Sequence, residues 1–82
     1  METLKGNMRI EGNNVYVSRY EVATAFFRTE EEQNIDMADA LNVMINAFCD
    51  EERKLEKNIT ELPFNILEYK NVIDYIEKSA LY

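Results

Sequence analysis

Apolar and polar residues alternate in two short segments near the start of the chain, Met8–Ile10 and Val15–Val17. Successive side chains of a strand point to opposite faces, so the apolar residues of both segments share one face. Between the segments, residues 11–14 contain Gly and Asn, which tolerate the positive φ of tight hairpin turns. The pattern predicts a β-hairpin over about residues 8–17, which must pack on other elements because an isolated hairpin is barely stable.

A signal for the start of a helix follows the hairpin. Ser18 and Glu21 have the spacing of a capping box, in which each side chain accepts a hydrogen bond from the other residue's amide. Apolar residues then recur at helical spacing, at Val22, Ala25 and Phe26. We expect a helix over about residues 19–31, which ends in an acidic run at residues 30–32, where the helix dipole disfavours negative charge.

The strongest periodic pattern lies in the middle of the chain. Apolar residues recur at intervals of 4, 3, 4 and 7, at Met37, Leu41, Met44, Phe48 and Leu55. This spacing predicts a long amphipathic helix over about residues 36–57. After a connection at residues 58–63, Asn65 and Glu68 indicate the start of a third helix over about residues 66–79.

These elements define the expected fold. The chain of 82 residues has the size of one domain and contains only two Gly and one Pro, so most of it should be regular structure. We predict a single domain over residues 1–82. Its fold class is mainly α with a minor β component: an N-terminal β-hairpin followed by a three-helix bundle.

The residue inventory excludes most enzyme chemistry. The chain has no His, so Ser-His-Asp and Cys-His arrangements are impossible and the commonest metal ligand is missing. The two glycines form no phosphate-binding loop. Asp36 and Asp39 suit the first turn of a helix and lack the central Gly of a calcium loop. We therefore predict a non-enzymatic protein that holds no cofactor and no metal.

The distribution of charge says more about function than the inventory of catalytic residues does. Acidic residues outnumber basic ones by 16 to 9, which gives a net charge of −7. Such a surface repels phosphate, so we expect no direct binding of nucleic acid. Residues 21–50 contain seven acidic residues and one basic residue. Either this acid keeps the protein soluble, or it binds a partner's basic surface through Glu30, Glu31, Glu32, Asp36 and Asp39.

The aromatic residues, five Tyr and four Phe, are numerous for one small core. Phe27 adjoins Phe26 along the chain, and Tyr75 belongs to the third predicted helix. Burying all of these rings would require cover on several helix faces. Because aromatic residues are enriched at protein interfaces, Phe27 and Tyr75 are candidate anchors for a partner or for a second copy of the chain.

Two segments resemble parts of acyl carrier proteins. Asp36–Leu41 is similar to the Asp-Ser-Leu start of the carriers' second helix, and Asn71–Ile76 is similar to their last helix. Met37 stands where the carriers have the serine that bears phosphopantetheine, so the carrier function is not transferred. Val17–Ala23 is similar to the first helix of a helix-turn-helix motif. The helix that would follow begins with acidic residues, which phosphates repel.

The sequence therefore predicts a small regulatory or inhibitory protein that binds another protein, one with a basic surface. Small acidic inhibitors of this kind are carried by phages and mobile elements as antiholins, antitoxins or anti-defence proteins, some of which mimic nucleic acid. The alternative is a structural or adaptor subunit that forms an obligate homo-oligomer. The single Cys and the polar first residues favour the cytoplasm, and no apolar run predicts membrane insertion.

Overall fold

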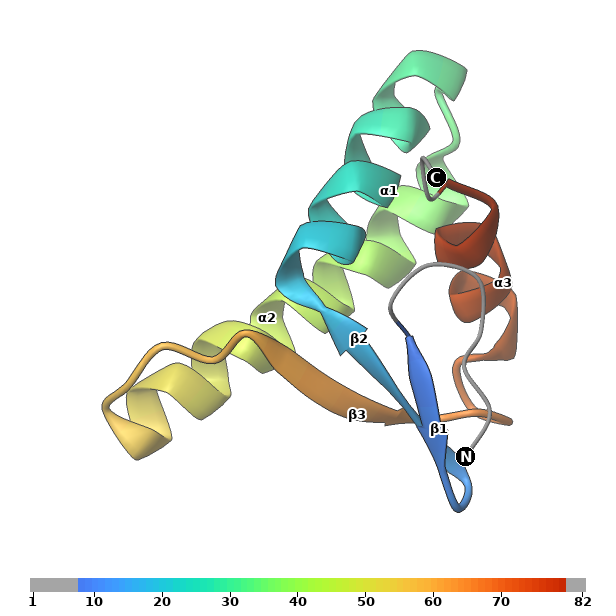
Figure 1. Ribbon diagram of the computed structural model, residues 1–82. Helices are drawn as coiled ribbons and strands as arrows, with labels where there is room; N and C mark the ends of the chain where they lie inside the picture. Colours follow the sequence, from blue (N-terminus) through green and yellow to red (C-terminus); the bar gives the residue numbers. More distant parts are fainter. Residues whose placement is uncertain (1–7, 80–82) are drawn as a thin grey trace.

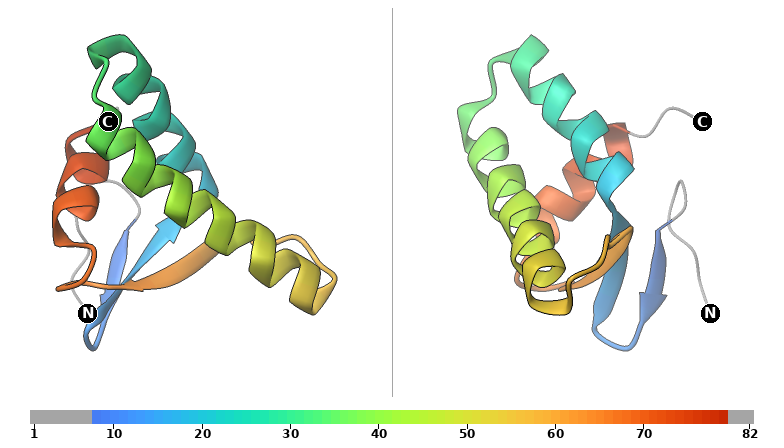
Figure 2. Two further views of the ribbon diagram at one scale, coloured as in Figure 1. Left: turned by 180° about the vertical axis from the view of Figure 1, so that it is seen from behind. Right: turned by 90° about the vertical axis from the view of Figure 1, so that its left-hand side faces the viewer.

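The computed structural model describes residues 8–79, which form a three-stranded antiparallel sheet and three helices (Figure 1). In chain order the elements are β1 (Arg9–Glu11), β2 (Asn14–Ser18), α1 (Arg19–Glu32), α2 (Ile35–Leu55), β3 (Glu61–Asn65) and α3 (Lys70–Ser79). Most of the described residues are helical, as expected, and the predicted hairpin is confirmed as β1 and β2. The helices lie together on one side of the sheet (Figure 2).

The hairpin forms for a local reason. Glu11 pairs with Asn14, which leaves a two-residue loop whose first position is Gly12. The φ of Gly12 is +61°, in the left-handed region that favours glycine, and this is the position at which type II′ turns require it. The turn thus fixes the register that places Ile10 opposite Val15 on the inner face of the sheet.

The sheet contains a third strand that the sequence analysis placed in a connection. β3 pairs antiparallel with β2, with Phe64 opposite Val15. Pro63, which suggested a loop, lies opposite Tyr16. The Arg19 amide donates a hydrogen bond to the Thr60 carbonyl, and hydrogen-bonded pairs recur at every second residue of an antiparallel ladder. Tyr16 and Pro63 therefore form a pair without hydrogen bonds. Because β3 is an edge strand, the N–H that Pro63 lacks would face away from β2 and the sheet loses nothing.

The first two helices begin at capping side chains. The capping box of Ser18 and Glu21 is confirmed, and α1 extends one residue beyond the predicted end, to Glu32. The Asn34 side chain accepts a hydrogen bond from the Met37 amide at 3.3 Å and so begins α2. α2 ends two residues before the predicted position, since the next residue after Leu55 takes a left-handed conformation.

The third helix begins four residues later than expected, at Lys70 rather than at residue 66. The predicted role of Asn65 as a capping residue is only partly correct. Its side chain accepts hydrogen bonds from the amides of Leu67 at 3.0 Å and Glu68 at 2.9 Å, but these bonds close a turn over residues 66–69 that precedes the helix.

One apolar cluster joins the sheet and the helices. Its buried members are Met8, Val15, Val17, Val22, Ala25, Leu41, Met44, Phe48, Phe64, Val72, Ile73 and Ile76. The predicted apolar stripe of α2 is confirmed at its centre but is wrong at Leu55, whose residue surface is 50% exposed. α1 contacts both other helices, and the strands supply part of the core. The helices therefore pack on a sheet as well as on one another, which the prediction of a three-helix bundle did not include.

Candidate functional site

α1 has a buried side and an exposed side. Glu21, Val22, Ala25 and Thr29 are buried toward the core. Tyr20, Ala23, Phe27, Glu30 and Glu31 are exposed, and their spacing places them along one stripe of the helix. Tyr20 is 75% exposed and Phe27 is 67% exposed, although both are large aromatic residues. We call this stripe of five residues the open face of α1.

The C-terminal end of the open face is acidic. Glu30 and Glu31 lie in the last turn of α1, which contains no basic residue. Neither side chain takes part in any ion pair between residues 8 and 79. Negative charge at this end of a helix opposes the helix dipole. The two carboxylates are therefore placed where they do not stabilise α1.

Asp36 and Asp39 lie nearby in the chain, in the first two turns of α2, and both are exposed. Like Glu30 and Glu31, they form no ion pair within the described part of the chain. Unlike them, they are placed at the positive end of a helix dipole, which accounts for them without a partner. These four acidic residues thus form two groups: the first pair lies where negative charge destabilises a helix, and the second pair lies where it stabilises one.

Glu32 and Tyr75 form a contact between two helices at the surface. The Tyr75 hydroxyl donates a hydrogen bond to Glu32 Oε1 at 2.8 Å, and Arg28 Nε donates to Glu32 Oε2 at 2.8 Å. The Arg28 guanidinium also lies 5.0 Å from the centre of the Tyr75 ring. Arg28, and to a lesser extent Tyr75, lower the pKa of Glu32, while burial and then the Glu32 carboxylate raise the pKa of Tyr75 to about 12. These residues connect α1 to α3.

Of the residues proposed from the sequence, the structure therefore brings Phe27, Glu30 and Glu31 together on the open face. It places Glu32 and Tyr75 in the contact between α1 and α3. The spacing of four residues between Arg28 and Glu32 is a signal for a helical ion pair that could have separated Glu32 from its two neighbours.

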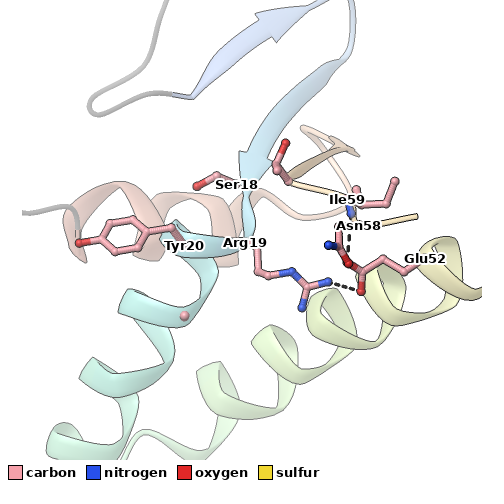
Figure 3. A pocket seen from close by; sticks show the side chains of 8 residues that line it. Ser18, Arg19, Tyr20, Glu52, Asn58 and Ile59 are labelled. Atoms are coloured by element: carbon pink, nitrogen blue, oxygen red, sulfur yellow. Dashed lines mark hydrogen bonds and ion pairs between the residues drawn. The ribbon is translucent and has the colours of Figure 1, made fainter. Parts of the chain in front are cut away.

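A groove of about 740 Å³ lies at the N-terminal end of the open face (Figure 3). It runs between the start of α1, the last turns of α2 and the segment before β3. Its lining residues are Ser18, Arg19, Tyr20, Ala23, Glu52, Asn58, Ile59 and Thr60. This groove was not predicted from the sequence, because its walls come from segments far apart in the chain and no local pattern joins them.

Glu52 holds the walls of the groove together. One of its carboxylate oxygens pairs with Arg19, and the other accepts a hydrogen bond from the Ile59 amide at 3.0 Å. The bond from the Ile59 amide is the largest cause that lowers the pKa of Glu52, and Arg19 adds to it. In Figure 3, Arg19 extends toward Glu52 while Tyr20 extends away from this pair. Both charges of the groove are thus satisfied within the protein.

A second groove, of about 640 Å³, lies between α2, the turn before α3, and α3. Its lining includes Met37, Ala40, Val43 and Leu67. Val43 is 54% exposed and Leu67 is 83% exposed, so this part of the surface is apolar. Asp36 and Asp39 precede Val43 on the same side of α2, but they lie at the positive end of the helix dipole, unlike the carboxylates of the open face.

Between residues 8 and 79, no group of three or more Cys, Asp and Glu side chains is arranged to hold a metal ion. No helix in the described range has the length and apolar content needed to cross a membrane. No protein-family model, curated protein or solved structure matches the chain.

Proposed function

We propose that this protein is a non-enzymatic regulatory or inhibitory protein that binds another protein through the open face of α1. The observation that supports this most is a stripe of two exposed aromatic residues, Tyr20 and Phe27, that ends in Glu30 and Glu31, two carboxylates without an ion pair among residues 8–79. Exposed aromatic residues are typical of the centre of a protein interface. Carboxylates at its rim favour a partner with a basic surface and speed the encounter with it.

The energetic placement of these residues supports the same conclusion. Each carboxylate at the C-terminal end of a helix costs about 0.3–1 kcal/mol of stability. The open face has two of them, in a last turn without basic residues. Residues that work against the local stability of a fold and gather on one surface are expected at functional sites.

The class of the protein follows from this mode of action. A small acidic chain that covers a basic surface blocks whatever that surface binds, and mimicry of nucleic acid is the extreme case. Small inhibitors of phages and mobile elements, such as antiholins, antitoxins and anti-defence proteins, likewise act by binding a partner. We place the protein with them by analogy of mechanism, acting in the cytoplasm.

A structural subunit that forms a homo-oligomer is the second candidate function. The groove between α2 and α3 supports it, because Val43 and Leu67 are apolar and exposed there. A stable dimer would bury such residues. The solution mass of the purified protein separates the two candidates: mass that rises with protein concentration, and a Leu67→Ser variant that stays monomeric, would favour the oligomer.

The proposed binding is tested by affinity capture from cells of the source organism with matched variants. Wild-type protein, Phe27→Ala, Glu31→Lys and Glu68→Lys are compared. Glu68 is exposed, lies outside the open face, and gives the same change of net charge as Glu31 when replaced by Lys. We expect a protein that the wild type and Glu68→Lys capture equally and that the two open-face variants capture at least tenfold less, as for loss of an interface anchor.

Two outcomes would contradict the proposal. One is equal capture of every enriched protein by all four variants, which would make the open face ordinary solvated surface. The other is the absence of any protein enriched over an unrelated acidic control. In addition, the association rate of the captured partner should fall with added salt for the wild type and fall less for Glu31→Lys.

A further inference from the structure

We propose that the groove beside Glu52 receives an apolar side chain of the same partner, while the partner's basic side chains lie at Glu30 and Glu31. This inference rests on the proposed function and specifies the chemistry of the partner's contacting segment. The two ends of the open face then have different roles. The groove binds the partner's apolar side chain, and the acidic end orients the partner through its basic side chains.

The lining of the groove determines what it accepts. Its charged residues, Arg19 and Glu52, are paired with each other, and the second oxygen of Glu52 is occupied by the Ile59 amide. Among the described lining residues, no unpaired charge is left to attract an anion or a cation. The rest of the lining consists of the uncharged polar residues Ser18, Asn58 and Thr60 and of Tyr20, Ala23 and Ile59, and most of its accessible surface is apolar. An apolar side chain is the group that fits this surface.

Contacts within the protein also hold two walls of the groove in place. The Arg19 guanidinium lies 5.2 Å from the centre of the ring of Phe48, a core residue that is 1% exposed. Glu52 in turn holds Arg19 and the segment that contains Ile59. A cavity whose walls are already ordered costs less to fill, because few side chains lose freedom on binding. Its volume of about 740 Å³ lies in the usual range for ligand sites, about 300–1,000 Å³.

The groove and the acidic end belong to one continuous surface. Tyr20 and Ala23 line the groove and are also members of the open face. At a rise of about 1.5 Å per residue, Ala23 lies about 10 Å from Glu30 along the helix, and Tyr20 lies about 16 Å from Glu31. The partner's apolar anchor and its basic residues should therefore be about 10–16 Å apart. That separation corresponds to about seven to eleven residues of a helix, or about three to five residues of a strand.

The inference is tested with synthetic peptides and the full-length protein. One peptide is helical and has a Leu anchor with two Arg placed seven and eight residues later. A second is extended and has the Arg pair four and five residues after Leu. Each has two controls, one with Ser in place of Leu and one with Glu in place of Arg. Binding is followed by changes in the amide NMR shifts of the labelled protein on titration.

We expect one of the two Leu–Arg peptides to shift the amides of Ala23, Ile59 and Glu31 together, and both of its controls to bind at least tenfold more weakly. Ala23→Gln places a longer side chain in the groove at an exposed helical position and should weaken the peptide at least tenfold. Asn46→Gln, at an exposed position of α2 outside the groove, should leave binding unchanged. Amide spectra of both variants check that the fold is intact.

Shifts confined to other surfaces, no shift at millimolar peptide, or equal binding of the Ser control would overturn the groove as the anchor site. These results would leave the capture experiment untouched, because that experiment depends on Phe27 and Glu31. If Ala23→Gln captures the partner as well as the wild type does while Phe27→Ala does not, the groove inference fails and the proposed function stands. If none of the three variants loses the partner, both fail.

Discussion

An aromatic ring and a carboxylate occur on each of the two sides of α1 that flank its buried stripe, but their surroundings differ. Toward α3, an aromatic residue and a carboxylate, Tyr75 and Glu32, are joined to each other and to Arg28. On the open face, Phe27 and Glu31 are exposed, and neither has a comparable partner among residues 8–79. Residue type alone does not distinguish the two sides. The two sides differ in whether the fold provides contacts for the ring and the carboxylate. On the open face it provides none among the described residues, so this ring and this carboxylate are available to another protein.

The largest expected difference between the two sides is in stability. Tyr75→Ala removes a half-buried ring, its hydrogen bond to Glu32 and its contact with Arg28. We expect it to lower the free energy of unfolding by about 2 kcal/mol. Phe27→Ala should change it by less than about 0.5 kcal/mol, since that ring is exposed. Urea denaturation of the two variants measures both values, and equal losses would mean that Phe27 is also part of the packed structure.

The next prediction separates the hydroxyl of Tyr75 from its ring. Tyr75→Phe should cost about 1 kcal/mol at neutral pH, because the hydrogen bond to Glu32 is lost. Tyr20→Phe is the matched control on the open face: Tyr20 is 75% exposed, and no change is expected.

The stability of the same two variants should differ in how it depends on alkaline pH. Burial and Glu32 raise the pKa of Tyr75 to about 12, from an ordinary value of 10.0. Between these two values the unfolded chain loses the proton first, so the contribution of Tyr75 to stability is fully present below pH 10 and is lost as the pH rises toward 12. Tyr75→Phe should flatten this alkaline decline relative to the wild type, and Tyr20→Phe should not. Unfolding measured at several alkaline pH values tests this, and identical slopes for all three proteins would contradict it.

Those elements of the fold that depend on local sequence were predictable. The turn at Gly12 and the capping box at Ser18 are determined by residues within a few positions, and both are confirmed. β3 was missed although Leu62 and Phe64 alternate about Pro63, because its pairing partner β2 lies far away in the sequence. A proline within an edge strand can be recognised only once the order of the strands is known.

The candidate site was predictable to a similar extent. The aromatic and acidic content of the open face was visible in the sequence, and Phe27, Glu30 and Glu31 were among the residues proposed from it. That Tyr75 and Glu32 would satisfy each other could not be predicted, since it requires the packing of α3 against α1. The groove could not be predicted either, because it requires Arg19 at the start of α1 to lie beside Glu52 of α2 and Ile59 of the segment before β3.

The smallest expected effect addresses the acidic end of the open face directly. If Glu31 has no partner in the fold and opposes the helix dipole, Glu31→Lys should raise the free energy of unfolding by about 0.3–1 kcal/mol at low ionic strength. The gain should nearly vanish at 1 M salt, where the Debye length is about 3 Å. Glu31→Gln should give a smaller gain of the same sign, because it removes the charge without reversing it. The same Glu31→Lys variant is expected to lose the partner, so stability and binding should move in opposite directions. A loss of stability in Glu31→Lys would instead mean that the carboxylate has a stabilising contact within the protein, and the distinction between Glu31 and Glu32 on which the open face depends would disappear.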